Sequence, residues 1–249
     1  MKYLWTILAC CPVLALAQSK PFTIEGKAQS YDAPAKAYLM YGEAGKNVDS
    51  VQIHKGSFSF KGTLENSEPL NAMLMIDKKG LSLRQAQRAG IQQFYVEPGK
   101  IKIESPDSLE HIKVTGTKTN LENQALQHLL ESTNKEIAIV LQEYQEGTPE
   151  QQKDSVYSKP FIKRYNTLAE KQKKISLAFA RQHPNSFVSL NAIIRSSGAF
   201  PDYASNYELM QGLSPEIRNS ALGKTFSNQL EAIKATAIGA MAPELPNRM

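Results

Sequence analysis

The sequence predicts an α+β protein in which an N-terminal antiparallel β-sandwich is followed by an α-helical section. From residue 21 to about residue 116, short segments of alternating apolar and polar residues are separated by turns, which is typical of half-buried strands. From Thr119 onward, apolar residues recur every three or four positions, which is the period of a helix. Hydrophobic residues make up 41% of the 249 residues, so the chain has enough apolar side chains for a packed core.

Residues 1–17 have the layout of a secretory signal peptide. Lys2 precedes an apolar run, and residues 15–17 form a small-x-small cleavage motif. We therefore expect cleavage after Ala17 and a periplasmic or exported protein. Because Cys10 lies in the apolar run, an outer-membrane lipoprotein with a lipid anchor at Cys10 is the alternative. The run is shorter than the roughly 20 residues of a membrane-spanning helix, and no transmembrane segment is expected elsewhere.

The predicted β-sandwich domain covers residues 18–118. Strands are expected over residues 21–26, 36–41, 70–76 and 111–116. Residues 48–62 predict a β-hairpin with its turn at Lys55 and Gly56, and residues 93–105 predict a second with its turn at Pro98 and Gly99. Strand periodicity places four aromatic side chains in the sandwich core: Phe22, Phe58, Phe60 and Phe94.

Four residues of the sandwich are candidate binding residues. Asp49 and Ser50 would contact a ligand at the edge of the sandwich, or Asp49 would bond nearby backbone at a strand start. Residues 77–93 are expected to form a basic surface loop. Arg84 and Arg88 in this loop would be the contacts for an anionic partner.

The predicted helical section covers residues 119–236. Thr119 and Glu122 have the spacing of a capping box at the first helix start. Helix breaks are expected at Gly147, Pro184 and Gly198, with a kink or restart at Pro160 and a last helical segment from Pro215 to about Ala235. Asn185 or Ser186 would cap the helix after Pro184. The section would pack on itself and on the sandwich, and would offer an apolar face, with a patch around Leu230 and Ile233, to a partner or a second copy.

The residue types favour binding over catalysis. Both cysteines, Cys10 and Cys11, lie in the expected leader, so the mature chain would carry no thiolate nucleophile, disulfide or Cys metal site. The histidines are not paired at metal-ligand spacing, and no glycine pattern of a nucleotide site occurs. The net charge of +5 is spread among interspersed acids, so we expect no nucleic-acid partner. We expect no cofactor and no enzymatic activity.

The order of several short motifs resembles the N-terminal half of exported thiol-disulfide oxidoreductases of the TlpA-like and AhpC/TSA type. These proteins carry an uncharacterised β domain ahead of a thioredoxin-fold domain. The residues that carry the resemblance are Phe22, Ile24 and Gly26; Asp49, Ser50 and Val51; Gly56, Phe58, Phe60 and Gly62; Phe94, Glu97, Pro98 and Gly99; Val114 and Gly116; residues 183–186; and Ile238, Gly239, Ala242 and Pro243.

The resemblance implies that residues 237–249 are the vestigial start of a redoxin domain. In the family, a strand and a Trp-Cys-x-x-Cys motif would follow, and this sequence has no position for either. The resemblance therefore implies a truncated, non-catalytic accessory module that positions or dimerises a redox domain, or recognises partner proteins of the cell envelope. The alternative is an envelope module that binds glycans or peptides through the β-sandwich.

Overall fold

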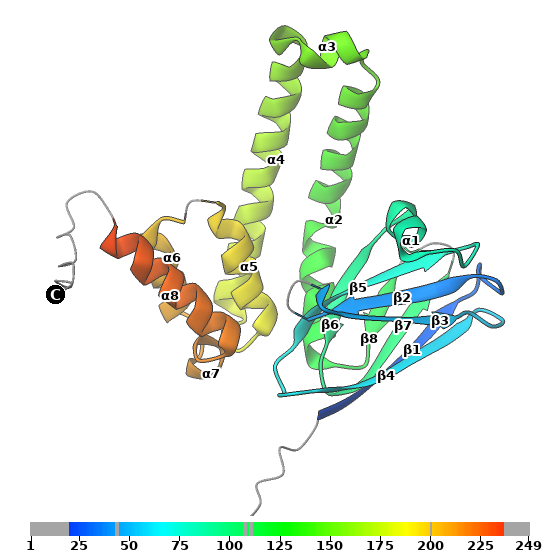
Figure 1. Ribbon diagram of the computed structural model, residues 1–249. Helices are drawn as coiled ribbons and strands as arrows, with labels where there is room; N and C mark the ends of the chain where they lie inside the picture. Colours follow the sequence, from blue (N-terminus) through cyan, green and yellow to red (C-terminus); the bar gives the residue numbers. More distant parts are fainter. Residues whose placement is uncertain (1–19, 43–44, 107–108, 110–111, 200, 237–249) are drawn as a thin grey trace, which may run out of the picture.

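The computed structural model describes residues 20–42, 45–106, 109, 112–199 and 201–236. The expected signal peptide, the lipid anchor at Cys10, the residue His111 and the expected redoxin start at 237–249 lie outside these residues. The described residues form the α+β structure that the sequence predicts, with strands in the N-terminal half and mainly helices in the C-terminal half (Figure 1).

Two four-stranded sheets face each other in the sandwich. Sheet A has the order β4-β1-β7-β8 and contains β1 (Lys20–Ala28), β4 (Ser57–Leu64), β7 (Gly99–Ser105) and β8 (Lys113–Thr115). Sheet B has the order β3-β2-β5-β6 and contains β2 (Lys36–Tyr41), β3 (Asn47–Gln52), β5 (Leu70–Asp77) and β6 (Gln92–Val96). The strands β1 and β7 pair in parallel, so the predicted sandwich is antiparallel in every pairing but this one.

The core between the sheets contains the aromatic side chains that strand periodicity places there. Phe22, Phe58, Phe60 and Phe94 are all buried, together with aliphatic residues from both sheets such as Ile24, Leu39, Leu74 and Ile101. Tyr31 is also buried. The sandwich therefore closes around its own core.

The two predicted hairpins are wrong, because each joins strands of different sheets. At Lys55 and Gly56 a tight turn does form, with hydrogen bonds in both directions between the backbones of His54 and Ser57 and positive φ at both turn residues. Beyond that turn, β3 pairs with β2 and β4 pairs with β1. In the same way, β6 pairs with β5, while β7 pairs with β1 and β8. In each segment, both strands turn their apolar side chains toward the same core. The alternating pattern therefore does not show whether the two strands share a sheet or lie in different sheets.

The predicted surface loop at residues 77–93 contains a short helix, α1 (Leu83–Ala89). Ser82 caps it by accepting a hydrogen bond from the backbone N–H of Gln85 at 3.3 Å. The buried Ala86 packs against Tyr38 and Met75 on the outer face of sheet B. The helix thus covers apolar side chains that strand alternation turns away from the sandwich core.

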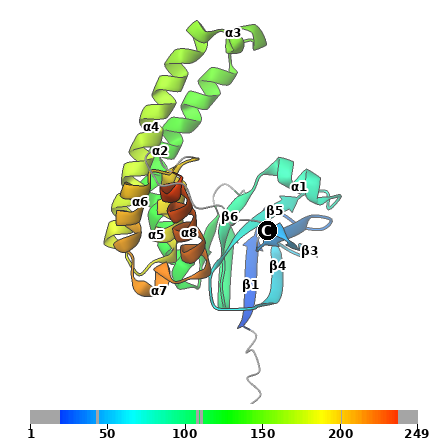
Figure 2. The same cartoon turned by 60° about the vertical axis from the view of Figure 1, so that its left-hand side comes forward.

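The helical section begins with a long hairpin. Helices α2 (Lys118–Gln145) and α4 (Ser155–Gln182) run antiparallel, and α3 (Pro149–Lys153) lies at the tip, away from the sandwich (Figure 1). The base of the hairpin packs with α5 (Phe187–Ser197), α6 (Tyr203–Gln211), α7 (Pro215–Arg218) and α8 (Ala221–Ala235) beside the sandwich (Figure 2). A second core fills this base.

Most predicted helix boundaries are confirmed, but two internal ones differ. The helix break lies at Asp154, whose side chain caps α4, and Pro160 sits inside α4, where its missing N–H frees only the carbonyl of the exposed Val156. The last segment is divided between α7 and α8, and Ser220 caps α8. Leu230 is buried in the helical core, so the apolar patch predicted around it is wrong.

A close contact between neighbouring strands gives the first testable expectation. Gly26 on β1 is paired with Phe58 on β4, and a Cβ built on Gly26 would lie 2.0 Å from the Phe58 ring. The substitution Gly26→Ala should therefore lower the free energy of unfolding by about 1–3 kcal/mol through overpacking. Urea denaturation measures this loss, and Lys27→Ala, exposed on the same strand, is the control. Equal stability of the two variants would contradict the contact.

Candidate functional site

The hairpin is joined to the sandwich by the side chain of Asn120 in the first turn of α2. The backbone N–H of Tyr95 on β6 donates to Asn120 Oδ1 at 2.9 Å, and Asn120 Nδ2 donates to the carbonyl oxygen of Tyr95 at 2.8 Å. A third hydrogen bond runs from Nδ2 to Thr117 Oγ1 at 2.9 Å. Because β6 is the edge of sheet B, the Asn120 amide takes the place of the next strand there.

The carboxylate of Glu97 caps the start of α2. It accepts hydrogen bonds from the backbone N–H of Thr119 at 3.0 Å and from the Thr119 hydroxyl at 2.8 Å. A negative charge is favourable at a helix N-terminus. The predicted capping box of Thr119 and Glu122 is therefore wrong: the helix begins at Lys118, and the cap comes from the sandwich.

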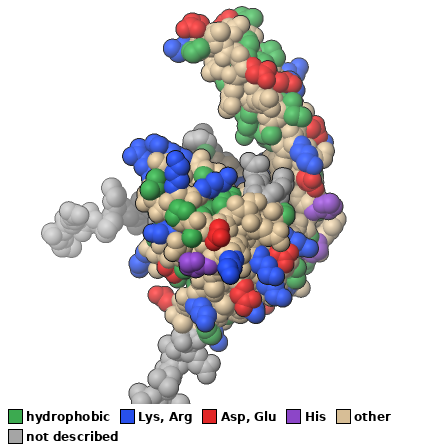
Figure 3. Space-filling model, turned by 90° about the vertical axis from the view of Figure 1, so that its right-hand side faces the viewer, with side chains coloured by type: hydrophobic (Ala, Val, Ile, Leu, Met, Phe, Trp, Pro, Cys, Tyr) green, Lys and Arg blue, Asp and Glu red, His purple; other side chains and the backbone are tan. Residues whose placement is uncertain are grey.

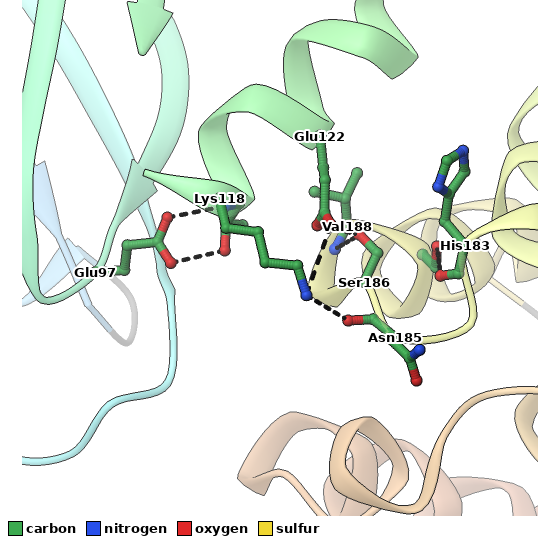
Figure 4. Close-up of polar contacts among 9 residues, drawn as sticks. Glu97, Lys118, Glu122, His183, Asn185, Ser186 and Val188 are labelled. Atoms are coloured by element: carbon green, nitrogen blue, oxygen red, sulfur yellow. Dashed lines mark hydrogen bonds and ion pairs between the residues drawn. The ribbon is translucent and has the colours of Figure 1, made fainter. Parts of the chain in front are cut away.

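Glu122 instead links α2 to α5 (Figure 4). Its carboxylate accepts a hydrogen bond from the hydroxyl of Ser186 at 2.7 Å and pairs with Lys118 at 3.7 Å. Ser186 is the N-cap of α5 and accepts from the backbone N–H of Val188 at 3.1 Å. Of the two residues that the sequence offered as this cap, the structure uses Ser186.

Two further contacts fix the base of the helical section against the sandwich. The carboxylate of Glu68, in the loop before β5, accepts from the backbone N–H of Ala221 at 2.8 and 2.9 Å, at the start of α8. The ring of Tyr95 packs edge-on against Phe187 with centroids 6.2 Å apart. Burial raises the pKa of Tyr95 to about 12.

The two long helices are closed against each other by their own side chains. Tyr144, Tyr157 and Phe161 form a ring cluster near the tip, with centroid separations of 5.1–6.0 Å. Lower down, Glu143 pairs with Arg164, and Lys171 donates to Glu136 at 3.2 Å. The hairpin is therefore a packed unit along most of its length.

Apolar side chains also lie on the outside of this hairpin. Of the eleven most exposed large apolar residues in the described chain, four lie on α2 and three on α4. We call the subset on the outer half of the hairpin the hairpin surface, which consists of Ile139, Leu141, Val156, Ile162 and Tyr165. A cavity of about 360 Å³ between the helices, lined by residues that include Ile139, Lys163 and Arg164, adjoins it.

Asp49 and Ser50 lie exposed on β3, the edge strand of sheet B. The Asp49 carboxylate accepts a hydrogen bond from the backbone N–H of Ser50 at 2.7 Å, which is the local backbone contact that the sequence offered as one of two alternatives. Arg84 and Arg88 lie exposed on α1, over the outer face of the same sheet. No contact between the two pairs is seen in the described residues.

Arg88 lines a basic hollow of about 390 Å³. The other lining residues are Asp77, Lys78, Lys79, Leu81, Gln85 and Ala89. Figure 3 shows Lys and Arg side chains gathered near the upper edge of the sandwich. The Asp77 carboxylate accepts backbone N–H bonds from Lys79 at 3.0 Å, Leu81 at 2.6 Å and Ser82 at 3.0 Å. These bonds, chiefly that from Ser82, lower the pKa of Asp77 and hold the loop before α1 in one shape.

The remaining titratable groups form no centre for chemistry within the described ranges. No group of three His, Cys, Asp or Glu side chains able to hold a metal ion is found there. His183 ends α4 and stacks on Phe179 with centroids 4.3 Å apart, as expected for a residue at a helix break. Among the same residues, no helix is both long and apolar enough to cross a membrane.

Sequence reasoning missed Glu97 and Asn120 as the residues that position the hairpin. In the sequence, Glu97 stands out only as part of a short motif, and Asn120 only as a residue inside the predicted capping box. A buried asparagine in a first helical turn is a weak signal, because its partner Tyr95 lies 25 residues away.

Residues 22–123 match the family model described as Domain of unknown function (DUF4369). Neither a search of curated proteins nor a search of solved structures found a match. The matched stretch covers the sandwich and ends in the second turn of α2, so it includes Tyr95, Glu97 and Asn120 but not the hairpin surface. The family description names no reaction and no link to TlpA-like or AhpC/TSA oxidoreductases.

The Asn120 contact predicts a large loss of stability when the amide is removed. In Asn120→Ala the buried N–H and C=O of Tyr95 lose their partner, which should cost about 2–4 kcal/mol of unfolding free energy. Chemical denaturation gives the loss, and hydrogen exchange should become faster at the Tyr95 amide. The matched change Asn123→Ala, also on α2, should cost much less. A Tyr95 amide that exchanges as slowly in Asn120→Ala as in the wild type would contradict this account.

The Asp77 contacts predict an acid-dependent change in stability. Because the folded state lowers the pKa of Asp77, the carboxylate stabilises the protein above the unfolded pKa of about 3.9 and loses this effect as the pH falls through the folded pKa. Asp77→Asn should be less stable than the wild type at neutral pH, and the difference should shrink below about pH 4. Denaturation midpoints measured across this range check the expectation, and a constant difference would oppose it.

Proposed function

We propose that this chain is a non-catalytic binding module that acts in the cell envelope and recognises a partner protein through the hairpin surface. The observation that carries the proposal is the exposed apolar side chains on the outer half of α2 and α4. Isolated exposed apolar residues are normal on a protein surface, but a concentration on one projecting element is typical of an interaction site.

The partner is a thioredoxin-fold protein or domain. This part of the proposal is supported by the motif order that resembles TlpA-like oxidoreductases. In such an arrangement, the sandwich and the base helices hold the hairpin, and the hairpin positions the redox partner. Export through residues 1–17, with a lipid anchor at Cys10 as the alternative, belongs to the same proposal.

The polar groups with the densest contacts support a holding role. Glu97, Asn120 and Glu122 each bond backbone or hydroxyl groups of a neighbouring element. Groups engaged in this way connect elements and are not available to a substrate. The glycan or peptide alternative draws no support from the sandwich aromatics, because Phe22, Phe58, Phe60 and Phe94 are buried in the core and offer no stacking surface.

Site-specific photo-crosslinking tests the partner. A benzophenone side chain placed at Ile162, which is 54% exposed on α4, should cross-link in cells to a protein with a thioredoxin fold, identified by mass spectrometry. The same label at Lys174, exposed farther along α4, is the matched control. Adding Leu141→Ser should weaken the cross-link at Ile162 several-fold, because apolar area is lost from the contact. Equal cross-linking at both positions would reject the hairpin surface as the site.

An insulin-reduction assay tests the non-catalytic part separately. The purified chain alone should not reduce insulin disulfides above the buffer rate. Turnover by the chain itself would overturn this part of the proposal, whatever the cross-linking shows.

A further inference from the structure

We infer that the loop before α1 and α1 itself form a surface that docks on a phospholipid membrane with anionic headgroups. We call this surface the basic face, and it consists of Lys78, Lys79, Leu81, Arg84 and Arg88. It lies on the sandwich, so it is separate from the hairpin surface, and the inference does not rest on the proposed partner protein.

The basic face carries a net positive charge. Lys79, Arg84 and Arg88 have no ion-pair partner in the part of the chain that the structure describes, and the Lys78 ammonium lies 5.6 Å from the centroid of the Tyr31 ring. The carboxylate that lines the hollow, Asp77, already accepts three backbone hydrogen bonds. Four exposed cations within eleven residues lie beside one carboxylate, so this surface keeps a net positive charge.

Leu81 gives the basic face an apolar centre. It is 68% exposed. Leu81 lines the same hollow as Lys78, Lys79 and Arg88. An exposed apolar side chain beside cations fits the boundary of a bilayer, where the side chain enters the acyl region and the cations contact lipid phosphates.

The shape of the loop is fixed before any membrane is met. The backbone N–H of Leu81 donates to Asp77 Oδ2 at 2.6 Å, and Ala86 anchors α1 on sheet B. Little conformational entropy is then lost on docking, which favours binding. A small free anion would use the arginines but would gain nothing from Leu81, and this difference separates a membrane from free phosphate.

Vesicle co-sedimentation of the full chain tests the inference. Vesicles of phosphatidylcholine are compared with vesicles in which about one-third of the lipid is phosphatidylglycerol. Residues 1–19 contribute equally in every variant, so the preference for anionic over neutral vesicles is the quantity measured. The wild type should prefer the anionic vesicles at low salt, and the preference should fall as salt is added.

Two variants and a matched control locate the surface. The double change Arg84→Gln and Arg88→Gln should lower partitioning about 25-fold, at about fivefold for each charge removed. Leu81→Ser should lower it several-fold with the salt dependence kept. The double change Lys173→Gln and Lys174→Gln removes the same charge from exposed positions of α4 and should change partitioning less than about twofold.

Three results would overturn the inference. The first is equal binding of the wild type to both kinds of vesicle. The second is an equal loss in the α4 control, which would mean that net charge alone drives binding. The third is undiminished binding of Leu81→Ser together with competition by inorganic phosphate at constant ionic strength, which would assign the arginines to a free anion.

Discussion

The arrangement of the whole molecule depends on how the open edge of sheet B is satisfied. At this edge the N–H and C=O of Tyr95 are buried, and groups of this kind cost several kcal/mol in total when they have no partner. No ninth strand is available in the described chain, and the amide of Asn120 supplies one acceptor and one donor at strand-like distances. This requirement fixes the first turn of α2 against β6, and the direction of the hairpin follows from it.

The sandwich contacts the helical section at both ends of that section. Glu97 caps α2, the first helix of the section, and Glu68 bonds the start of α8, the last. In both contacts a carboxylate from a sandwich loop or strand end meets the positive end of a helix, where backbone N–H groups have no partner within the helix. The Tyr95 ring adds an apolar contact by entering the helical core from the sheet. The two layers of the molecule are therefore mutually positioned rather than loosely linked.

Local signals in the sequence predict the class, the core aromatics and most helix ends, because each depends on residues close in the chain. Ser186 and Gly198 act at the boundaries that their own side chain and backbone favour. The two predicted hairpins fail because Ile53 and Phe58 alternate correctly for one core whether their strands share a sheet or face each other.

Glu97 and Asn120 could not be assigned because their partners lie 22 and 25 residues away. The residue types alone point to four exposed polar candidates, Asp49, Ser50, Arg84 and Arg88. They do not predict the backbone hydrogen bonds to the Asp77 carboxylate that shape the basic hollow.

The same anchoring explains why the hairpin is suited to present a contact surface. Its inner side is closed by Tyr144, Tyr157 and Phe161, so the apolar residues on its outer side are not needed to hold the helices together. Three contacts fix its base: Asn120 bonds β6, Glu97 from the sandwich bonds the first turn of α2, and Glu122 bonds the N-cap of α5. A partner that binds near the tip therefore meets an arm that is already ordered, and most of the apolar area buried there contributes to affinity instead of offsetting the cost of ordering the arm.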